Sequence, residues 1–193
     1  QTPRPSVTSL ADELARAPDF TEAALSPGGH SLAWVQNVSA SGASWSAGTE
    51  IFLAGIRHPA SVVPVTAESS GRSAARSTVR EDSVAWSPNG SEIAFISDAR
   101  SPGQAELYVM RVADHSVRQL TRVRGDLQSP KWSHDGQRIA ALFTENAGRA
   151  PGPLAAVPPP TGVIGQITHE QRILLVDPAD DRTRLVSPAD LYV

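Results

Sequence analysis

The feature that most constrains the fold of this chain is a short segment that occurs three times. Each copy predicts a strand, a Ser-x-x-Gly turn, two polar residues and a second, apolar strand with an Ile-Ala or Leu-Ala pair. The copies are residues 24–35, 85–96 and 131–142. The glycine that ends the turn tolerates the positive φ that other residues resist. Strands joined by so tight a turn are expected to be antiparallel neighbours.

Two further strands follow each copy. After the second copy they are predicted at 106–111 and 117–121, after the third at 172–177 and 182–186, and after the first, more loosely, at 50–54 and 61–65. Four short strands in a unit of about forty residues are typical of a β-propeller blade. The sequence therefore predicts an all-β fold, a partial β-propeller of about three four-stranded antiparallel blades. One short helix is expected at 9–17, with Ser9 as its N-cap and Pro18 after its end.

The spacing of the copies indicates insertions. The first blade is expected to carry extra loop at 37–49 and 67–80, and the third a proline-rich, extended insertion at 146–169. The predicted organisation is a tether and helix at 1–19, blades at 20–80, 81–126 and 127–190, and the possible start of a further blade at 191–193. Three blades are fewer than the four to eight that close a propeller, so another part of a longer protein, or another chain, is expected to complete the ring.

Composition excludes several classes of function. The formal net charge is −3, from 17 basic and 20 acidic residues, which argues against binding to nucleic acid or to an anionic membrane surface. There is no cysteine, and no apolar run is long enough to span a bilayer. The sequence starts at Gln1, and Met110 is its only methionine. Its polar first residues resemble a tether after a signal-peptidase cut, which favours export; an arbitrary boundary is the alternative.

The second copy carries a family resemblance. Residues 86–98, Trp-Ser-Pro-Asn-Gly-Ser-Glu-Ile-Ala-Phe-Ile-Ser-Asp, followed by Glu-Leu-Tyr-Val at 106–109, resemble the Trp-Ser-Pro-Asp-Gly repeat. That repeat occurs in TolB-type periplasmic propellers and in the N-terminal propellers of prolyl oligopeptidase-family serine peptidases. The three copies extend the resemblance over residues 20–190. The lead-in at 18–20, the opening at 25–29 and the long insertion at 146–169 are more similar to dipeptidyl- and acylaminoacyl-peptidase propellers.

The resemblance implies a function. In the peptidase family the propeller screens peptides by size, and a separate C-terminal α/β-hydrolase domain carries the chemistry. The chain is thus expected to be a non-catalytic propeller portion of an exported serine peptidase, in the bacterial periplasm or outside the cell, that gates peptide access to a hydrolase domain absent from it. The alternative is a TolB-like module that binds another protein. Neither interpretation implies a cofactor.

One segment is similar to a nucleophile elbow. Ser46 in Ser-Trp-Ser-Ala-Gly (44–48) would be the nucleophile, but an elbow needs Gly-x-Ser-x-Gly on a strand, a turn and a helix. Ser44 stands where the first glycine belongs, and a strand is predicted after the segment. We expect a polar loop between strands, and no catalytic residue in this chain.

Other candidates are weighed against ordinary structural roles. The five histidines, none in a metal-binding pair, are His30, His58, His115, His134 and His169. Of these, His30, His115 and His134 are expected in solvated turns. The acidic groups Asp177, Asp180 and Asp181, and Glu81 with Asp82, could bind calcium or act as paired acids, although aspartate is normal in turns. The segment 162–165 is too short a glycine motif to bind phosphate.

The remaining aromatic and basic residues have simpler interpretations. Trp86 and Trp132 occupy equivalent positions and are expected to pack between blades, whereas Trp45 is the tryptophan expected in a surface contact. Arg72, Arg76 and Arg80 are spaced by four and are expected in a loop rather than a basic helix. The sequence thus predicts no catalytic, cofactor or metal residues and leaves the substrate-binding residues unknown.

Overall fold

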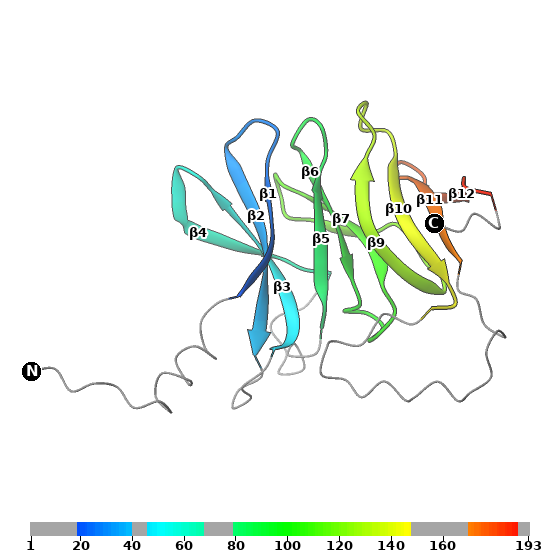
Figure 1. The fold of residues 1–193 in the computed structure, drawn as a ribbon. Helices are drawn as coiled ribbons and strands as arrows, with labels where there is room; N and C mark the ends of the chain where they lie inside the picture. Colours follow the sequence, from blue (N-terminus) through cyan, green and yellow to red (C-terminus); the bar gives the residue numbers. More distant parts are fainter. Residues whose placement is uncertain (1–18, 40–45, 68–78, 148–169, 189–193) are drawn as a thin grey trace, which may run out of the picture.

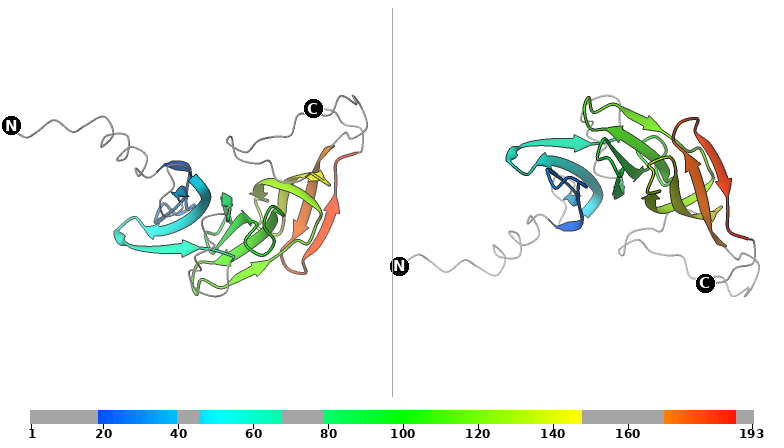
Figure 2. Two further views of the ribbon diagram at one scale, coloured as in Figure 1. Left: turned by 90° about the horizontal axis from the view of Figure 1, so that it is seen from below. Right: turned by 90° about the horizontal axis from the view of Figure 1, so that it is seen from above.

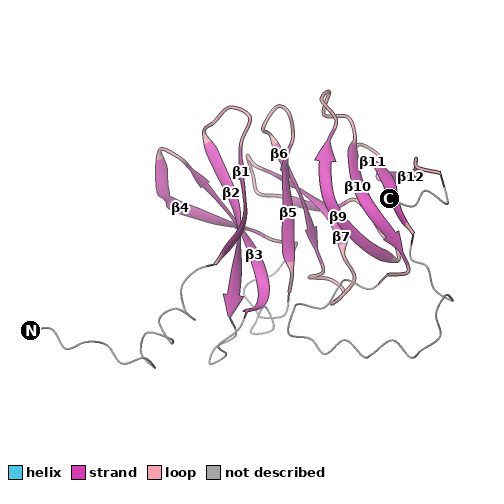
Figure 3. Cartoon of the chain, viewed as in Figure 1, coloured by secondary structure: helices cyan, strands magenta, loops and turns pink. Residues whose placement is uncertain are grey.

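Twelve strands and no helix make up the described part of the chain. In the computed structural model, residues 19–39, 46–67, 79–147 and 170–188 are described (Figure 1). Figure 3 shows these residues as strands joined by loops and turns. The strands are β1 (Phe20–Leu25), β2 (Ser31–Ser39), β3 (Ser46–Gly55), β4 (His58–Val65), β5 (Glu81–Trp86), β6 (Glu92–Ser97), β7 (Glu106–Arg111), β8 (Val117–Gln119), β9 (Gly125–Trp132), β10 (Ile139–Glu145), β11 (Gln171–Asp177) and β12 (Arg182–Leu185).

The strands form three separate four-stranded sheets. Their orders are β1-β2-β3-β4, β5-β6-β7-β8 and β9-β10-β11-β12, and every neighbouring pair is antiparallel. Each sheet is therefore a simple meander, in which every strand pairs with the strand next to it in sequence. The predicted three blades of a partial propeller are confirmed; we call the sheets blade 1, blade 2 and blade 3.

The repeated turn has the chemistry that the sequence predicts. Its closing glycine has a φ of +68° at Gly29, +70° at Gly90 and +70° at Gly136. The glycine N–H donates to the carbonyl of the turn serine, at 2.8 Å in the first copy and 2.9 Å in the other two. The hydroxyl oxygen of that serine accepts from the N–H five residues later, as Ser87 does from Glu92 at 2.9 Å. The hairpin is thus fixed locally in all three blades.

The sheets pack face to face like the blades of a fan (Figure 2). Between blades 1 and 2, Ala33, Val35 and Ile51 meet Ile93, Phe95, Tyr108 and Met110. Between blades 2 and 3, Ala94, Ile96, Leu107 and Val109 meet Ile139, Ala141, Phe143 and Leu174. Successive side chains of a strand face opposite sides of a sheet. Blade 2 is accordingly buried on both faces, whereas blades 1 and 3 are each covered on one.

The first strand of each blade lies against the first strand of the next. We call β1, β5 and β9 the inner strands; Figure 1 shows them side by side. The indole Nε1 of Trp86 donates to the carbonyl of Ala24 at 3.0 Å, and that of Trp132 donates to the carbonyl of Ala85 at 3.1 Å. The prediction that these two tryptophans pack between blades is confirmed. Each one connects its own inner strand to the inner strand before it.

One predicted loop is wrong in part. Residues 37–49 were expected to be loop, but β2 continues to Ser39 and β3 begins at Ser46, with Asn37 opposite Thr49. Two long antiparallel strands satisfy each other's backbone groups, which a solvated loop would leave to water. The expected helix at 9–17, the residues 191–193 and nearly all of the insertion 146–169 lie outside the described residues.

Candidate functional site

All three inner strands are irregular at the same level. The pairing shifts register between Phe20 and Glu22 in β1, between Asp82 and Ala85 in β5, and in β9 opposite the stretch from Ala140 to Leu142. Ser83 and Ser129 occupy equivalent repeat positions there, with φ of 61° and 51°. These are left-handed values that cost a non-glycine residue about 1–2 kcal/mol. Such β-bulges redirect side chains and are frequent next to binding sites.

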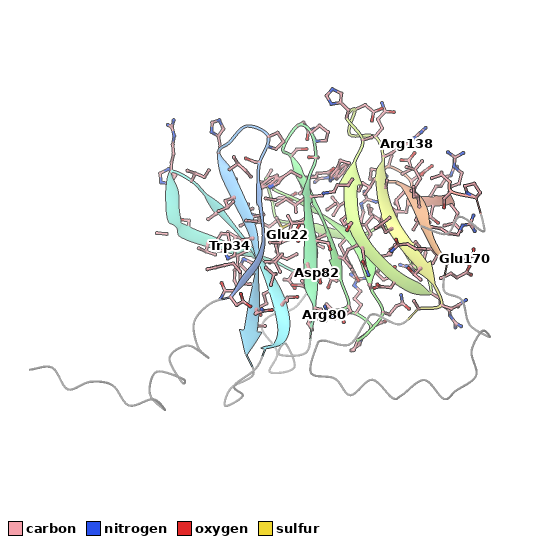
Figure 4. All side chains as sticks on the ribbon, viewed as in Figure 1. Glu22, Trp34, Arg80, Asp82, Arg138 and Glu170 are labelled. Carbon is pink, nitrogen blue, oxygen red and sulfur yellow. The ribbon has the colours of Figure 1, made fainter. Side chains whose placement is uncertain are left out.

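The bulge in β5 holds the carboxylate of blade 1. The backbone N–H groups of Val84 and Ser83 at this bulge favour the ionised form of the Glu22 carboxyl and so lower its pKa. Burial raises the pKa of Glu22 above its ordinary value, the two N–H groups offset part of that rise, and the charge of Asp82 adds to it. Figure 4 shows Glu22 and Asp82 on neighbouring inner strands, with Arg80 just before the start of β5. A connected set of charged groups thus follows the inner strands.

A polar hollow of about 290 Å³ lies between β5 and β9, and we call it the inner hollow. Its polar lining is Arg80, Asp82, Ser83, Asp126, Gln128 and Ser129. Both left-handed serines are therefore part of its wall. Two carboxylates and one guanidinium give the lining a formal charge of −1. Hollows of this size, lined by a few convergent polar groups, suit small polar ligands or one end of a larger one.

Asp126 is the most enclosed charged group of this lining, with only 6% of its surface exposed. Its Oδ2 accepts a hydrogen bond from Gln128 Nε2. Its Oδ1 is buried and has no hydrogen-bond partner within the described part of the chain. Burying a carboxylate oxygen without a donor is costly, so Oδ1 is an unsatisfied acceptor in the wall beside the inner hollow.

Glu81, which precedes Asp82 in β5, faces the opposite side of the sheet. It is 2% exposed, and its Oε1 accepts from Thr66 Oγ1 at 2.9 Å, from the Ala67 N–H at 2.8 Å and from Ser97 Oγ at 3.1 Å. These bonds clamp the end of blade 1 to blade 2. Glu81 and Asp82 are consecutive in a strand and face opposite sides, so they do not form the paired acids considered from the sequence.

The elbow-like segment does not form an elbow in its described part. Ser46 is the first residue of β3 and pairs with Ser39 of β2, and the strand continues to Gly55. No turn and helix follow Ser46, which an elbow requires. Ser44 and Trp45 lie outside the described residues, as do Arg72 and Arg76.

Three histidines lie where the sequence predicts. His30, His115 and His134 are exposed in turns, and His115 takes a φ of 56°. His58 is exposed at the start of β4, and His169 lies outside the described residues. No group of three His, Asp or Glu side chains in the described ranges is arranged to hold a metal ion.

The acidic turn of blade 3 has structural partners. Asp177 accepts from the Ala179 N–H at 3.0 Å, Asp180 pairs with Arg182 at 3.0 Å, and Asp181 pairs with Arg118 of blade 2. Aspartates in turns commonly bond the backbone two residues on, as Asp177 does here. The turn therefore connects blades 2 and 3.

An apolar hollow of about 540 Å³ lies on the outer face of blade 1, and we call this face the free face. Its wall is entirely apolar and includes Phe20, Leu32, Trp34 and Ile56. Phe20 is 61% exposed and Ile56 49%. Large exposed apolar patches mark contact surfaces in soluble proteins. In the propeller arrangement this face is turned toward the position of a preceding blade.

The sequence missed Asp126 and Gln128 of the inner hollow and the role of Trp34 on the free face. One signal was available: Asp82 and Gln128 each stand five residues before the turn serine of their copy, and both are polar in a strand that is otherwise partly apolar. Alignment of the copies around this position would have grouped them with the bulge serines.

No helix in the described segments is long and apolar enough to cross a membrane.

Comparison with known proteins identifies the fold. The structure resembles an acylaminoacyl peptidase of Pyrococcus horikoshii, with a TM-score of 0.60 and 12% identity over 93% of this chain and 26% of that one. It also resembles the β-propeller domain of the Trilobed protease of Pyrococcus furiosus, with a TM-score of 0.58 and 11% identity over 90% of this chain and 44% of that one. It also resembles TolB of Acinetobacter baumannii, with a TM-score of 0.53 and 17% identity over 86% of this chain and 32% of that one.

Comparison with the sequences of known proteins finds a similarity to one peptidase. The chain is 37% identical over 65 residues to the uncharacterized peptidase YuxL of Bacillus subtilis (strain 168), a match that covers 34% of this chain and 10% of that protein. No protein-family model matches the chain. The chain thus spans a minor part of each of these proteins. It has the propeller fold found in acylaminoacyl peptidases and in TolB, as the Trp-Ser-Pro-Asn-Gly resemblance predicts.

Proposed function

We propose that this chain is the non-catalytic propeller portion of an exported serine peptidase and screens peptides on their way to an α/β-hydrolase domain outside it. The observation that carries the proposal is the 37% identity to a peptidase, YuxL, over 65 residues. The likeness in fold to acylaminoacyl peptidases agrees with it but is shared with TolB. The described residues supply a scaffold and a polar inner edge, and chemistry is assigned to another domain.

The free face of blade 1 supports a larger ring. Where two blades meet, the proline of one turn lies beside the turn glycine of the next blade. Pro27 Cδ would be 3.6 Å from a Cβ on Gly90, and Pro88 Cδ would be 3.6 Å from a Cβ on Gly136. The corresponding position on Gly29 has no atom within 4 Å. Gly29 and the apolar free face together match the surface that blades 2 and 3 present to the blade before them. We infer that a further blade covers this surface in the whole protein.

The test uses the full protein encoded by the gene that carries this sequence. We expect it to hydrolyse short acyl-peptide anilides, and the 193-residue chain alone to hydrolyse none. A propeller that screens by size should lower kcat/KM for long peptides relative to short ones. The matched control is the full protein with the serine of its hydrolase-domain Gly-x-Ser-x-Gly replaced by alanine. If the full protein lacks such a domain and cleaves no peptide, the proposal is wrong.

A TolB-like binding module is the second candidate, because the TolB likeness has a comparable TM-score. This candidate expects the coding sequence to end after further blades. It also expects the free protein to form a stable complex with another envelope protein. Peptide hydrolysis by the full protein would count against it, and the size dependence of that hydrolysis would separate screening from a purely structural propeller.

A further inference from the structure

We propose that Arg184, in the last strand of blade 3, binds an acidic turn of a following blade, as Arg118 of blade 2 binds the turn of blade 3. The partner is the turn between the third and fourth strands of that blade, with an aspartate at its left-handed position. The inference rests on the part of the proposed function that both candidates share, a propeller with further blades. It adds the residue of this chain that makes the joint and the chemistry of the group that it meets.

The joint between blades 2 and 3 supplies the template. Arg118 lies opposite Val109 in the pairing of β8 with β7, and Val109 is buried between blades 2 and 3. The Arg118 guanidinium donates through Nη1 to Asp181 Oδ1 and through Nη2 to the carbonyl oxygen of Pro178, both in the turn between β11 and β12. The rigid fork of N–H donors in arginine suits two acceptors held side by side. One side chain thus fastens the turn of one blade to the fourth strand of the blade before it.

Arg184 occupies the same position in blade 3. Arg118 lies opposite Val109, which in turn pairs with Ala94. Arg184 lies opposite Leu175, which pairs with Ala140, the alanine of the same Ile-Ala pair in the third copy of the repeat. The Arg184 side chain is exposed, and it has no hydrogen bond or ion pair with any described residue. The arginine that makes the joint in blade 2 is therefore repeated in blade 3 without its partner.

The face that carries Arg184 resembles a joint that is still open. Leu174 and Val176 are buried against blade 2, so the residue between them and Arg184 opposite it point away from blade 2. On that side Ile173 is 42% exposed, whereas Leu107 at the equivalent position of blade 2 is fully buried against blade 3. A hollow of about 450 Å³ lies beside Arg184. Figure 2 shows blade 3 at the end of the fan of described strands.

The joint between blades 1 and 2 has neither half of this contact. Where blade 2 has Arg118, blade 1 has Val63. Where the blade 3 turn has Asp181, the blade 2 turn has His115, and the two residues share left-handed φ values of 58° and 56°. The cation and the acid are thus present together at one joint and absent together at the other. Because Arg184 supplies the cation again, we expect the acid in the turn that meets it, and aspartate tolerates the left-handed conformation there.

A second copy of this chain is a poorer partner. Two copies joined head to tail would place blade 1 of one copy against the outer side of blade 3 of the other. The turn between β3 and β4 would then meet Arg184, and this turn carries Arg57 and no acidic residue. Two guanidinium groups repel each other, and neither can accept a hydrogen bond. The charge therefore favours a blade whose sequence lies outside this chain.

The experiment uses the full protein with Arg184→Lys and a carbodiimide, a reagent that joins an amine to a carboxylate in direct contact. We expect mass spectrometry to find residue 184 joined to the aspartate of the following blade's turn. Arg118→Lys is the benchmark and should join residue 118 to Asp181. Arg111→Lys is the matched control, since its acid is Asp114 in its own turn, and it should join to no other blade. Lys131 is the only lysine of this chain, so the background is low.

A charge-reversal cycle measures the strength of the contact. Arg184→Glu in the full protein should lower the melting temperature by about 1–3 °C, because it sets two carboxylates against each other at the joint. Replacing the aspartate of the following turn by arginine in the same protein should restore at least half of the loss. Arg111→Glu breaks an ion pair within one turn, so the same second replacement should not rescue it.

Three results would overturn the proposal. One is a full protein with no following blade, or with no acidic residue at the left-handed position of that blade's turn. Another is the absence of the cross-link at residue 184; if the benchmark at residue 118 also fails, the template itself is missing. The third is a cross-link from residue 184 to a second copy, seen as a covalent dimer. None of these results depends on peptide hydrolysis, so the joint can fail in an active peptidase and can hold in a TolB-like protein that cleaves nothing.

Discussion

Trp34 and Phe52 in blade 1 stack across neighbouring strands in the same way as Phe95 and Tyr108 in blade 2. The ring centroids are 5.7 Å apart in both pairs, with interplanar angles of 27° and 25°. Both pairs occupy equivalent repeat positions, opposite each other in the second and third strands of a blade. Phe95 and Tyr108 are fully buried against blade 1, whereas Trp34 lines the open free face.

This difference distinguishes the geometry of an aromatic pair from its burial, which could not be told apart in a single blade. The antiparallel register places the two rings opposite each other, so the geometry of the pair is set within the sheet. The neighbouring blade decides how much ring surface is removed from water, so the energy of the pair is set between sheets. In blade 1 the register sets the geometry of the Trp34–Phe52 pair, but no described blade covers the pair and removes it from water. Four predictions test this separation, from the largest expected effect to the smallest.

The largest effect is expected from truncating the buried ring. Phe95→Ala should lower the free energy of unfolding by about 3–5 kcal/mol, because it leaves a cavity between blades 1 and 2. Trp34→Ala, at the equivalent position, should cost only about 1–2 kcal/mol, mostly through the lost stacking on Phe52. Urea unfolding of the 193-residue chain measures both. Equal losses would mean that the free face is covered in solution, for instance by a second copy, and a concentration series would detect this.

The tryptophan bonds between inner strands give the next effect. Trp132→Phe removes the hydrogen bond to the Ala85 carbonyl and should lower the free energy of unfolding by about 1–2 kcal/mol. Trp34→Phe is the matched control, because the buried Nε1 of Trp34 has no partner within the described part of the chain. The same change there should cost little or even stabilise. The prediction fails if the two substitutions shift the urea midpoint by the same amount.

The phenol of the buried pair gives a smaller effect of opposite sign. Tyr108 is fully buried, and its hydroxyl has no hydrogen-bond partner among the described residues. Burial raises the pKa of this phenol above its ordinary value. Tyr108→Phe removes an unsatisfied polar atom and keeps the ring, so we expect a gain of up to about 1 kcal/mol in thermal or urea unfolding. A clear loss of stability would instead point to a bound water that the hydroxyl holds.

The parts of this fold that the sequence predicts are those with local causes. The strand at 106–111 has the predicted bounds, and the Ser-x-x-Gly turns form as expected, because the serine hydroxyl and the glycine act within six residues. The strand expected at 117–121 ends instead at Gln119. Thr121 turns its hydroxyl to Glu106 on the neighbouring strand, a partner that local pattern does not reveal.

The inner hollow could not be predicted in the same way. Its walls come from β5 and β9, which meet only when blades 2 and 3 pack together. The left-handed backbone at Ser83 and Ser129 has no signal in residue type, since serine is not favoured there over glycine or asparagine. The free face was missed because Trp34 follows the same apolar alternation as its buried counterpart Phe95. Burial depends on the neighbouring blade, and the alternation does not encode it.

The smallest effect concerns Glu22, a charged group of blade 1 that lies beside the bulge in β5 of blade 2. Burial is the main cause of its raised pKa, so its ionised form is less favourable in the fold than in the unfolded chain. Its contribution is fully present below the ordinary value of 4.5 and is lost as the pH rises through the raised value. The parent should therefore lose stability relative to Glu22→Gln across that window, in melting curves taken at a series of pH values. High salt screens the charge of Asp82 but not burial, so most of the difference should persist there. Parallel curves for the two proteins would contradict the prediction, because they would show that the carboxyl is hydrated in the fold.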